Sequence, residues 1–63
     1  MKLIEVLEVV SIDKTIMVIV YNDGDLKKFV GNSMELIYSM AEYKYRKVFN
    51  IHATNDILTI FVE

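Results

Sequence analysis

The hexapeptide EYKYRK, residues 42–47, alternates tyrosines with cations just before the chain turns strongly apolar. Rings that stack on bases and cations that contact phosphates make a single-strand nucleic-acid site, provided that they share one surface. A strand would turn the two tyrosines to one side and Lys44 and Arg46 to the other. Cations in a last helical turn also complement the negative end of the helix dipole. We therefore interpret the segment first as the end of a helix.

The single histidine, His52, and the NDGD segment are the other positions whose residue types could carry chemistry. A general base needs an orienting partner, and the sequence places no carboxylate beside His52. An EF-hand loop starting at Asp23 requires glycine where Lys28 stands and glutamate where Met34 stands, so NDGD is typical of a turn. Phosphate-loop and metal-ligand spacings are also lacking. We expect no enzyme activity, no catalytic residue, no cofactor and no metal.

The length of 63 residues predicts a single domain, residues 1–63, with a marginal core, because folding at this size buries only roughly 60% of the unfolded surface. No cysteine is present, so dense packing or self-association must compensate, and a hydrophobic content of 54% supports both. The net charge of −2 disfavours bulk nucleic-acid binding.

No segment predicts contact with a membrane. The longest charge-free apolar run, TIMVIVYN, is too short to span one, and Glu5 and Glu8 interrupt the N-terminal stretch where a signal peptide stays uncharged. We expect a cytoplasmic protein, with a composition typical of low-GC bacteria or their phages.

The first half of the chain is rich in valine and isoleucine and is interrupted by the turn signals SIDK and NDGD. This pattern predicts strands at about 2–11, 15–22 and 25–30. A turn at Asp13 and Lys14 would pair the first two strands through one apolar face. Asp23-Gly24 is either a two-residue turn or part of a longer loop with a bulge. The opposite face is nearly as apolar and carries Val6, Val10, Met17, Ile19 and Tyr21.

The second half predicts one helix and a hairpin. Asn32 and Glu35 form a variant of the capping box, so we expect a helix over about 33–45, with Tyr45 well inside its apolar arc and Tyr43 at the edge. A turn at Asn55-Asp56 predicts strands 48–54 and 57–62. In this register one apolar face pairs Ala53 with Leu58, Ile51 with Ile60 and Phe49 with Val62. The other face pairs Thr54 with Ile57, His52 with Thr59 and Asn50 with Phe61.

These elements predict a small α+β fold with a mainly antiparallel five-stranded sheet and one helix, in the order β-β-β-α-β-β. The order resembles the topology of the OB fold over the whole chain, through MKLIEVLEVV, TIMVIVYN, LKKFV, the helix and VFNIHATNDILTIFVE. That resemblance implies a small barrel as the alternative architecture.

Because one helix covers only one side of an open sheet, the second apolar face predicts an interface. We expect a non-catalytic interaction protein, homodimeric and with room for an unidentified protein partner, of the accessory or inhibitory kind that phages and mobile elements encode. The alternative is an OB-like single-stranded nucleic-acid-binding protein. Its stacking rings would be Tyr43, Tyr45, Phe29 or Phe61, and its cations Lys27, Lys28, Lys44, Arg46 and Lys47.

Overall fold

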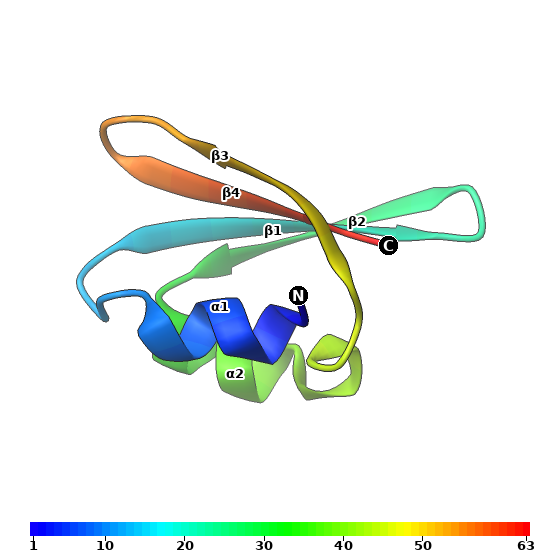
Figure 1. The fold of residues 1–63 in the computed structure, drawn as a ribbon, viewed down its shortest axis with the longest axis horizontal. Helices are drawn as coiled ribbons and strands as arrows, with labels where there is room; N and C mark the ends of the chain where they lie inside the picture. The colour runs from blue at the N-terminus through cyan, green and yellow to red at the C-terminus, as the bar shows by residue number, and fades with distance from the viewer.

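In the computed structural model, which describes residues 1–63, two helices lie on one face of a four-stranded sheet (Figure 1). The elements are α1 (Leu3–Val9), β1 (Thr15–Asn22), β2 (Asp25–Gly31), α2 (Ser33–Ser39), the short 3-10 helix η1 (Ala41–Tyr43), β3 (Val48–Ala53) and β4 (Ile57–Val62). The strands lie in the order β2-β1-β4-β3, with a parallel central pair and antiparallel outer pairs. The fold is therefore small, α+β and built on a mixed sheet. Neither helix is long and apolar enough to cross a membrane.

The prediction of five strands and one helix is wrong in its first element, because residues 3–9 form α1 instead of a strand. Leu3, Val6, Leu7 and Val10 follow the i, i+3, i+4, i+7 spacing of a helix, and the first three are buried against the sheet. The β-branched residues of this segment suggested a strand, but the helical spacing agrees with the observed burial. The barrel alternative is also wrong, since β2 and β3 are the unpaired ends of the sheet.

The start of α1 is fixed by hydrogen bonds to groups outside the helix. The backbone N–H of Lys2 donates to the Glu5 carboxylate at 2.7 Å. The N–H groups of Leu3 and Ile4 donate to carbonyls of the 44–46 segment, at 2.9 and 2.8 Å. These bonds satisfy donors that a first helical turn leaves without an intrahelical partner. They also attach the N-terminus to the segment that follows η1.

The hairpin of β1 and β2 matches its predicted bounds closely, and its turn has two residues. Asn22 pairs with Asp25, which leaves Asp23 and Gly24 as the turn. Their φ angles are 51° and 86°, the left-handed values that a type I′ turn requires at both positions. The turn fixes the register, so Val18 and Val20 face the helices while Ile19 faces away.

We expect Gly24→Ala to lower the free energy of unfolding by about 1 kcal/mol, because alanine is strained at this positive φ. No atom lies within 4 Å of the added Cβ, so the loss reports backbone conformation and not a clash. Urea unfolding followed by circular dichroism measures it. Asp23→Gly is the control and should not destabilise the chain; an unchanged midpoint for Gly24→Ala would contradict the turn assignment.

The second helix starts as predicted and ends early. Asn32 Oδ1 accepts the N–H of Glu35, and Glu35 Oε1 accepts the N–H of Asn32, both at 2.9 Å, which completes the capping box. The α-helix ends at Ser39 and η1 follows, so the predicted span 33–45 is too long. The change of path reverses the predicted tyrosine order: Tyr43 is 5% exposed and Tyr45 is 66% exposed. The carbonyls of Lys44 and Arg46 accept hydrogen bonds from the start of α1.

The C-terminal hairpin confirms most of its predicted register. Ala53 pairs with Leu58, and Ile51 with Ile60, around a turn at residues 55–56. A bulge between Val48 and Asn50 then shifts the ladder, so Val62 pairs with Val48 and not with the predicted Phe49. The extra residue turns the Phe49 side chain to the opposite side of the sheet.

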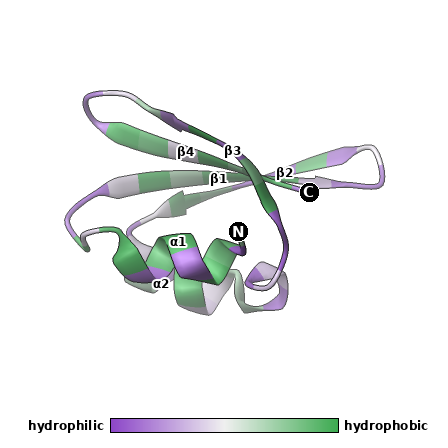
Figure 2. Cartoon of the chain, in the orientation of Figure 1, coloured by the Kyte–Doolittle hydropathy of each residue, from purple (hydrophilic) through white to green (hydrophobic).

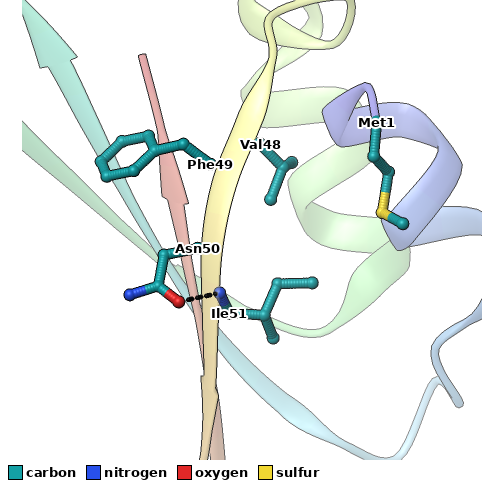
Figure 3. Close-up of a pocket in the computed structure, with 5 residues that line it drawn as sticks. All are labelled: Met1, Val48, Phe49, Asn50 and Ile51. Carbon is teal, nitrogen blue, oxygen red and sulfur yellow. Dashed lines mark hydrogen bonds between the residues drawn. The ribbon is translucent and has the colours of Figure 1, made fainter.

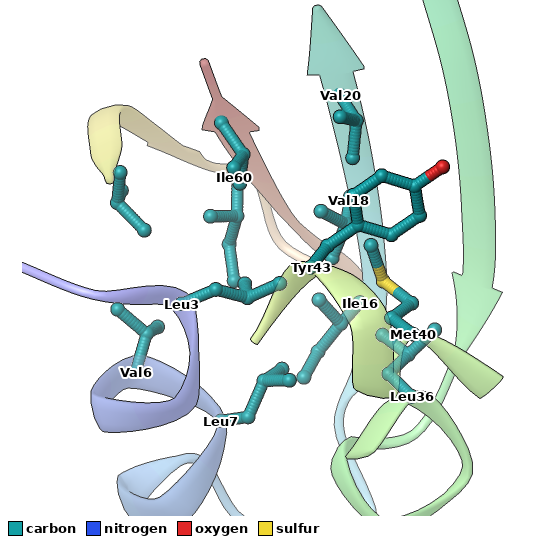
Figure 4. Packing of buried hydrophobic residues seen from close by; sticks show 12 residues of the cluster. Leu3, Val6, Leu7, Ile16, Val18, Val20, Leu36, Met40, Tyr43 and Ile60 are labelled. Carbon is teal, nitrogen blue, oxygen red and sulfur yellow. The ribbon is translucent and has the colours of Figure 1, made fainter. Parts of the chain in front are cut away.

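The core lies between the helices and the facing side of the sheet (Figure 4). Alternate residues of the central strands point into it, as a period of two requires. Its buried apolar residues are Leu3, Val6, Leu7, Ile16, Val18, Val20, Leu36, Met40, Tyr43, Val48, Ile60 and Val62. Figure 2 shows hydrophobic residues along the strands as well as on the helices.

Candidate protein interaction surface

The side of the sheet away from the helices has no layer over it, and we call it the open sheet face (Figure 1). In β1, the alternate residues Ile16, Val18 and Val20 are buried under the helices, so their neighbours point the other way. Strand register then assigns the remaining positions. The open sheet face comprises Met17, Ile19, Tyr21, Leu26, Lys28, Val30, Phe49, Asn50, His52, Ile57, Thr59 and Phe61.

Cross-strand pairing arranges this face in rows. One row runs through Val30, Met17, Thr59 and His52, from β2 to β3. The next row runs through Lys28, Ile19, Phe61 and Asn50. Met17, Ile19 and Phe61 therefore lie together on the two central strands, and Lys28, Asn50 and His52 lie on the outer strands.

Three aromatic rings form a cluster at one end of the open sheet face. The ring centroids of Tyr21 and Phe49 are 5.6 Å apart, and those of Phe49 and Phe61 are 6.1 Å apart. Tilted rings at these distances attract one another beyond the area that they bury. The bulge in β3 is the reason that Phe49 joins the cluster, so the predicted pairing of Phe49 on the helix side is corrected here.

The structure brings together only part of the predicted interface. Met17, Ile19 and Tyr21 are neighbours on the open sheet face, as their alternation predicted. Val6 is buried in the core on α1, and Val10 is half-buried at the end of that helix, so neither belongs to this face. Both were misplaced because their segment was interpreted as a strand. The apolar members that the predicted interface did not include are Leu26, Val30, Phe49, Ile57 and Phe61.

The open sheet face is nearly free of charge. Lys28 is its only formally charged side chain, and it lies on the edge strand β2. A contiguous apolar surface with charge confined to its rim is typical of protein interfaces.

The predicted nucleic-acid residues divide between two sides of the molecule. Lys27 pairs with Val20 and so faces the helix side, where its Nζ lies 3.4 Å from the Tyr43 hydroxyl, whereas Lys28 is on the open sheet face. The Arg46 guanidinium lies 5.2 Å from the centre of the Tyr43 ring. Because Tyr43 is buried, its ring is not free to stack on a base.

Tyr45 is the exposed ring of this region. Lys2 Nζ lies 5.6 Å from its centre and Lys44 Nζ lies 5.1 Å from it, both within cation–π range. The backbone of Lys47 pairs with that of Lys2 in an isolated antiparallel bridge. We call Tyr45, Lys2, Lys44 and Lys47 the cation–tyrosine cluster. One ring and one cation of EYKYRK, Tyr45 and Lys44, thus share a surface, which neither a helix nor a strand would automatically produce.

His52 is exposed opposite Thr59, in the register that the sequence predicted. No group of three or more His, Asp or Glu side chains is placed to hold a metal ion. We expect His52→Ala to change the free energy of unfolding by less than about 0.5 kcal/mol, because surface substitutions away from special features are nearly neutral. Thermal unfolding of the variant measures this, and a loss above 1.5 kcal/mol would contradict the exposed position.

A shallow pocket of about 270 Å³ lies beside β3 (Figure 3). Met1, Val48, Phe49, Asn50 and Ile51 line it. Figure 3 shows the Val48 and Ile51 side chains on the same side of β3 as Met1, and Phe49 on the other side. The pocket is below the size of a typical small-molecule site, so it suits a single apolar side chain.

No family model, curated protein or solved structure matches the chain. Function is therefore inferred from three surfaces: the open sheet face, the edge of β3 with its pocket, and the cation–tyrosine cluster.

Proposed function

We propose that this chain is a non-catalytic interaction module that forms a homodimer through its open sheet face. The observation that carries the proposal is the Tyr21–Phe49–Phe61 cluster on a sheet face with no covering layer. Aromatic residues in a desolvated patch supply much of the energy of protein interfaces. In a cell the dimer would act in the cytoplasm as an accessory or inhibitory factor, with its other surfaces available to a further protein.

The exposed apolar area is sufficient for association of modest strength. The large side chains of the face that are between 42% and 65% exposed are Tyr21, Leu26, Val30 and Phe49. Covering each of these side chains would contribute roughly 1 kcal/mol. In a two-fold dimer the same side chain is covered in both copies, so each contribution counts twice. The total, of the order of 10 kcal/mol, lies within the range of about 4–15 kcal/mol that rigid-body association costs. Half-buried Met17, Ile19 and Phe61 add to it.

A second copy of the chain can pack on this face because the faces of two copies do not repel each other electrostatically. Its one formal charge, on Lys28, lies at the rim, so two copies can meet without bringing like charges together at the centre. A standard interface buries about 800 Å² per partner, which is roughly a fifth of the 4190 Å² that the chain exposes. A two-fold arrangement closes the assembly at two copies.

Amide chemical shifts recorded during dilution test the proposal. We expect concentration-dependent shifts at residues 17, 19, 21 and 61, and none on the outer surface of α1 and α2. Shifts that are confined to the helices would contradict an interface on the open sheet face, and spectra that do not change with concentration would contradict self-association.

A second function, binding of single-stranded nucleic acid, is favoured by the cation–tyrosine cluster alone. Tyr45 is exposed, and Lys2 and Lys44 lie within cation–π range of its ring. A ring for stacking and cations for phosphates are then on one surface, which is what such a site requires. The net charge of −2 and the burial of Tyr43 weigh against this function.

The two functions differ in their response to salt. If nucleic acid binds through three cations, the logarithm of affinity for a labelled oligothymidylate falls with the logarithm of salt concentration with a slope of about −2. Lys44→Glu should then weaken binding, whereas Lys14→Glu, at a cation outside the cluster, should not. The homodimer proposal predicts no such binding, so a salt-dependent, Lys44-dependent affinity would favour the second function.

A further inference from the structure

The outer edge of β3 is free beyond its first residue. The sheet ends at β3, so one side of this strand has no neighbouring strand of the sheet. The N-terminal segment covers only its beginning: the N–H of Val48 donates to the Met1 carbonyl at 2.7 Å, and the N–H of Leu3 donates to the Arg46 carbonyl at 2.9 Å. This short antiparallel ladder shows that the edge is oriented to accept a strand. The ladder reaches Val48, the first residue of β3.

The two edges of the sheet differ in charge. β2 carries Asp25, Lys27 and Lys28, and charged residues on an edge strand oppose the addition of another strand. β3, with the sequence VFNIHA, carries no carboxylate, lysine or arginine. Its residues from 49 to 53 are all exposed. The edge of β3 therefore lacks the protection that the edge of β2 has.

The pocket lies where an added strand would place a side chain. Met1, Val48 and Ile51 line it on the helix side of β3, at the point where the ladder with the N-terminal segment ends. Side chains of an added strand alternate between the two faces of the sheet. One of them would enter the pocket, and the next would lie beside Phe49 at the margin of the open sheet face.

We propose that the edge of β3 binds an extended, uncharged segment of a partner protein as a fifth strand, antiparallel to β3 and in line with Met1–Leu3. Backbone hydrogen bonds provide affinity in this mode of recognition, and side-chain pockets provide specificity. The segment that fits places a large aliphatic side chain in the pocket. This site adjoins the homodimer surface at Phe49 and Asn50, but its backbone hydrogen bonds lie along the edge of β3, and Met1, Val48 and Ile51 line its pocket on the helix side.

A flexible segment fits this edge better than a second copy of β3. The bulge at residues 48–50 bends the edge, and two bent strands related by a two-fold axis would diverge. The N–H of Ile51 already donates to Asn50 Oδ1 at 2.9 Å, so a partner must displace that side chain or bond on either side of it. An extended peptide can adjust to both features, whereas a strand held in a folded copy cannot.

Fluorescence anisotropy with a labelled, end-blocked hexapeptide that alternates threonine with isoleucine tests this site. We expect the full chain to bind the peptide, and Ile51→Lys to weaken binding roughly tenfold or more by placing a charge at the edge and in the pocket. Leu26→Lys on the opposite edge strand is the matched control and should bind as the unaltered chain does. Circular dichroism of both variants confirms that the fold is retained.

N-methylation of the peptide separates strand addition from general hydrophobic contact. Methylating the amides on the side that faces β3 should abolish binding, and methylating the other side should leave it unchanged. Hydrogen exchange at the Ala53 amide should slow when the unmethylated peptide is added. Equal affinity of both methylated peptides, equal loss with Ile51→Lys and Leu26→Lys, or no binding at all would each overturn the proposal.

The homodimer proposal and the proposal of a binding site at the β3 edge can be tested independently. Ile51→Lys should leave the dimer of the open sheet face intact in sedimentation experiments. A peptide whose binding is lost with Ile19→Glu and retained with Ile51→Lys would overturn the edge site and place the peptide on the open sheet face.

Discussion

Replacing Tyr43 with alanine is expected to lower the free energy of unfolding by about 3 kcal/mol or more, because truncating a buried aromatic side chain leaves a cavity. The Tyr43 ring packs at 5.6 Å edge-on to the ring of Phe29, under Arg46 and beside Lys27. For a chain of 63 residues the total stability is of the order of 3–9 kcal/mol, so this single change removes a large part of it.

Tyr45→Ala is the matched control, two residues away and with the same side chain removed. Its ring is largely exposed and lies within cation–π range of only Lys2 and Lys44, so we expect a loss below about 0.5 kcal/mol. Urea unfolding of both variants, followed by circular dichroism, gives the comparison. A larger loss for Tyr45→Ala would support a helix that continues to residue 45 and would contradict the observed end at Ser39.

Local signals in the sequence predicted the two hairpins and the start of α2. The Asp23-Gly24 and Asn55-Asp56 turns fix strand pairing within a few residues, and Asn32 with Glu35 fixes a helix start through two hydrogen bonds. Each of these features is decided by residues close in sequence. They could therefore be predicted from the sequence without knowledge of any tertiary contact.

Features that depend on distant contacts were not predicted. The segment 3–9 contains both helical spacing and β-branched residues, and its helix is held in place by carbonyls from the 44–46 segment. The parallel pairing of β1 with β4 joins strands more than 30 residues apart and has no local turn signal. These long-range contacts decide both the architecture and the position of Tyr43.

The candidate surface was predicted in its centre and missed at its margin. Alternation in β1 placed Met17, Ile19 and Tyr21 together, because a period of two is read directly from the sequence. Phe49 joined them only through a bulge, which shifts side chains between faces without a distinctive sequence signal. Val6 does not belong to the surface, because its segment is helical and Val6 is buried in the core.

Ile19→Glu is expected to weaken the homodimer by about 100-fold or more, since it buries a carboxylate in each copy at the centre of the interface. Ile19 lies between Lys28 and Phe61 in the sheet, so glutamate gains a cross-strand cation in the monomer and the fold is retained. Lysine at this position would face Lys28 and destabilise the fold itself. Tyr38→Glu, at a side chain that is 79% exposed on α2, is the control and should leave the dimer unchanged.

Sedimentation equilibrium of the unaltered chain, at concentrations from micromolar to several hundred micromolar, tests the homodimer most directly. We predict a reversible transition from the 7.3 kDa monomer to twice that mass, which Ile19→Glu shifts beyond the accessible concentrations and Tyr38→Glu does not. A single 7.3 kDa species over the whole range, or a dimer that Ile19→Glu leaves intact, would contradict association through the open sheet face.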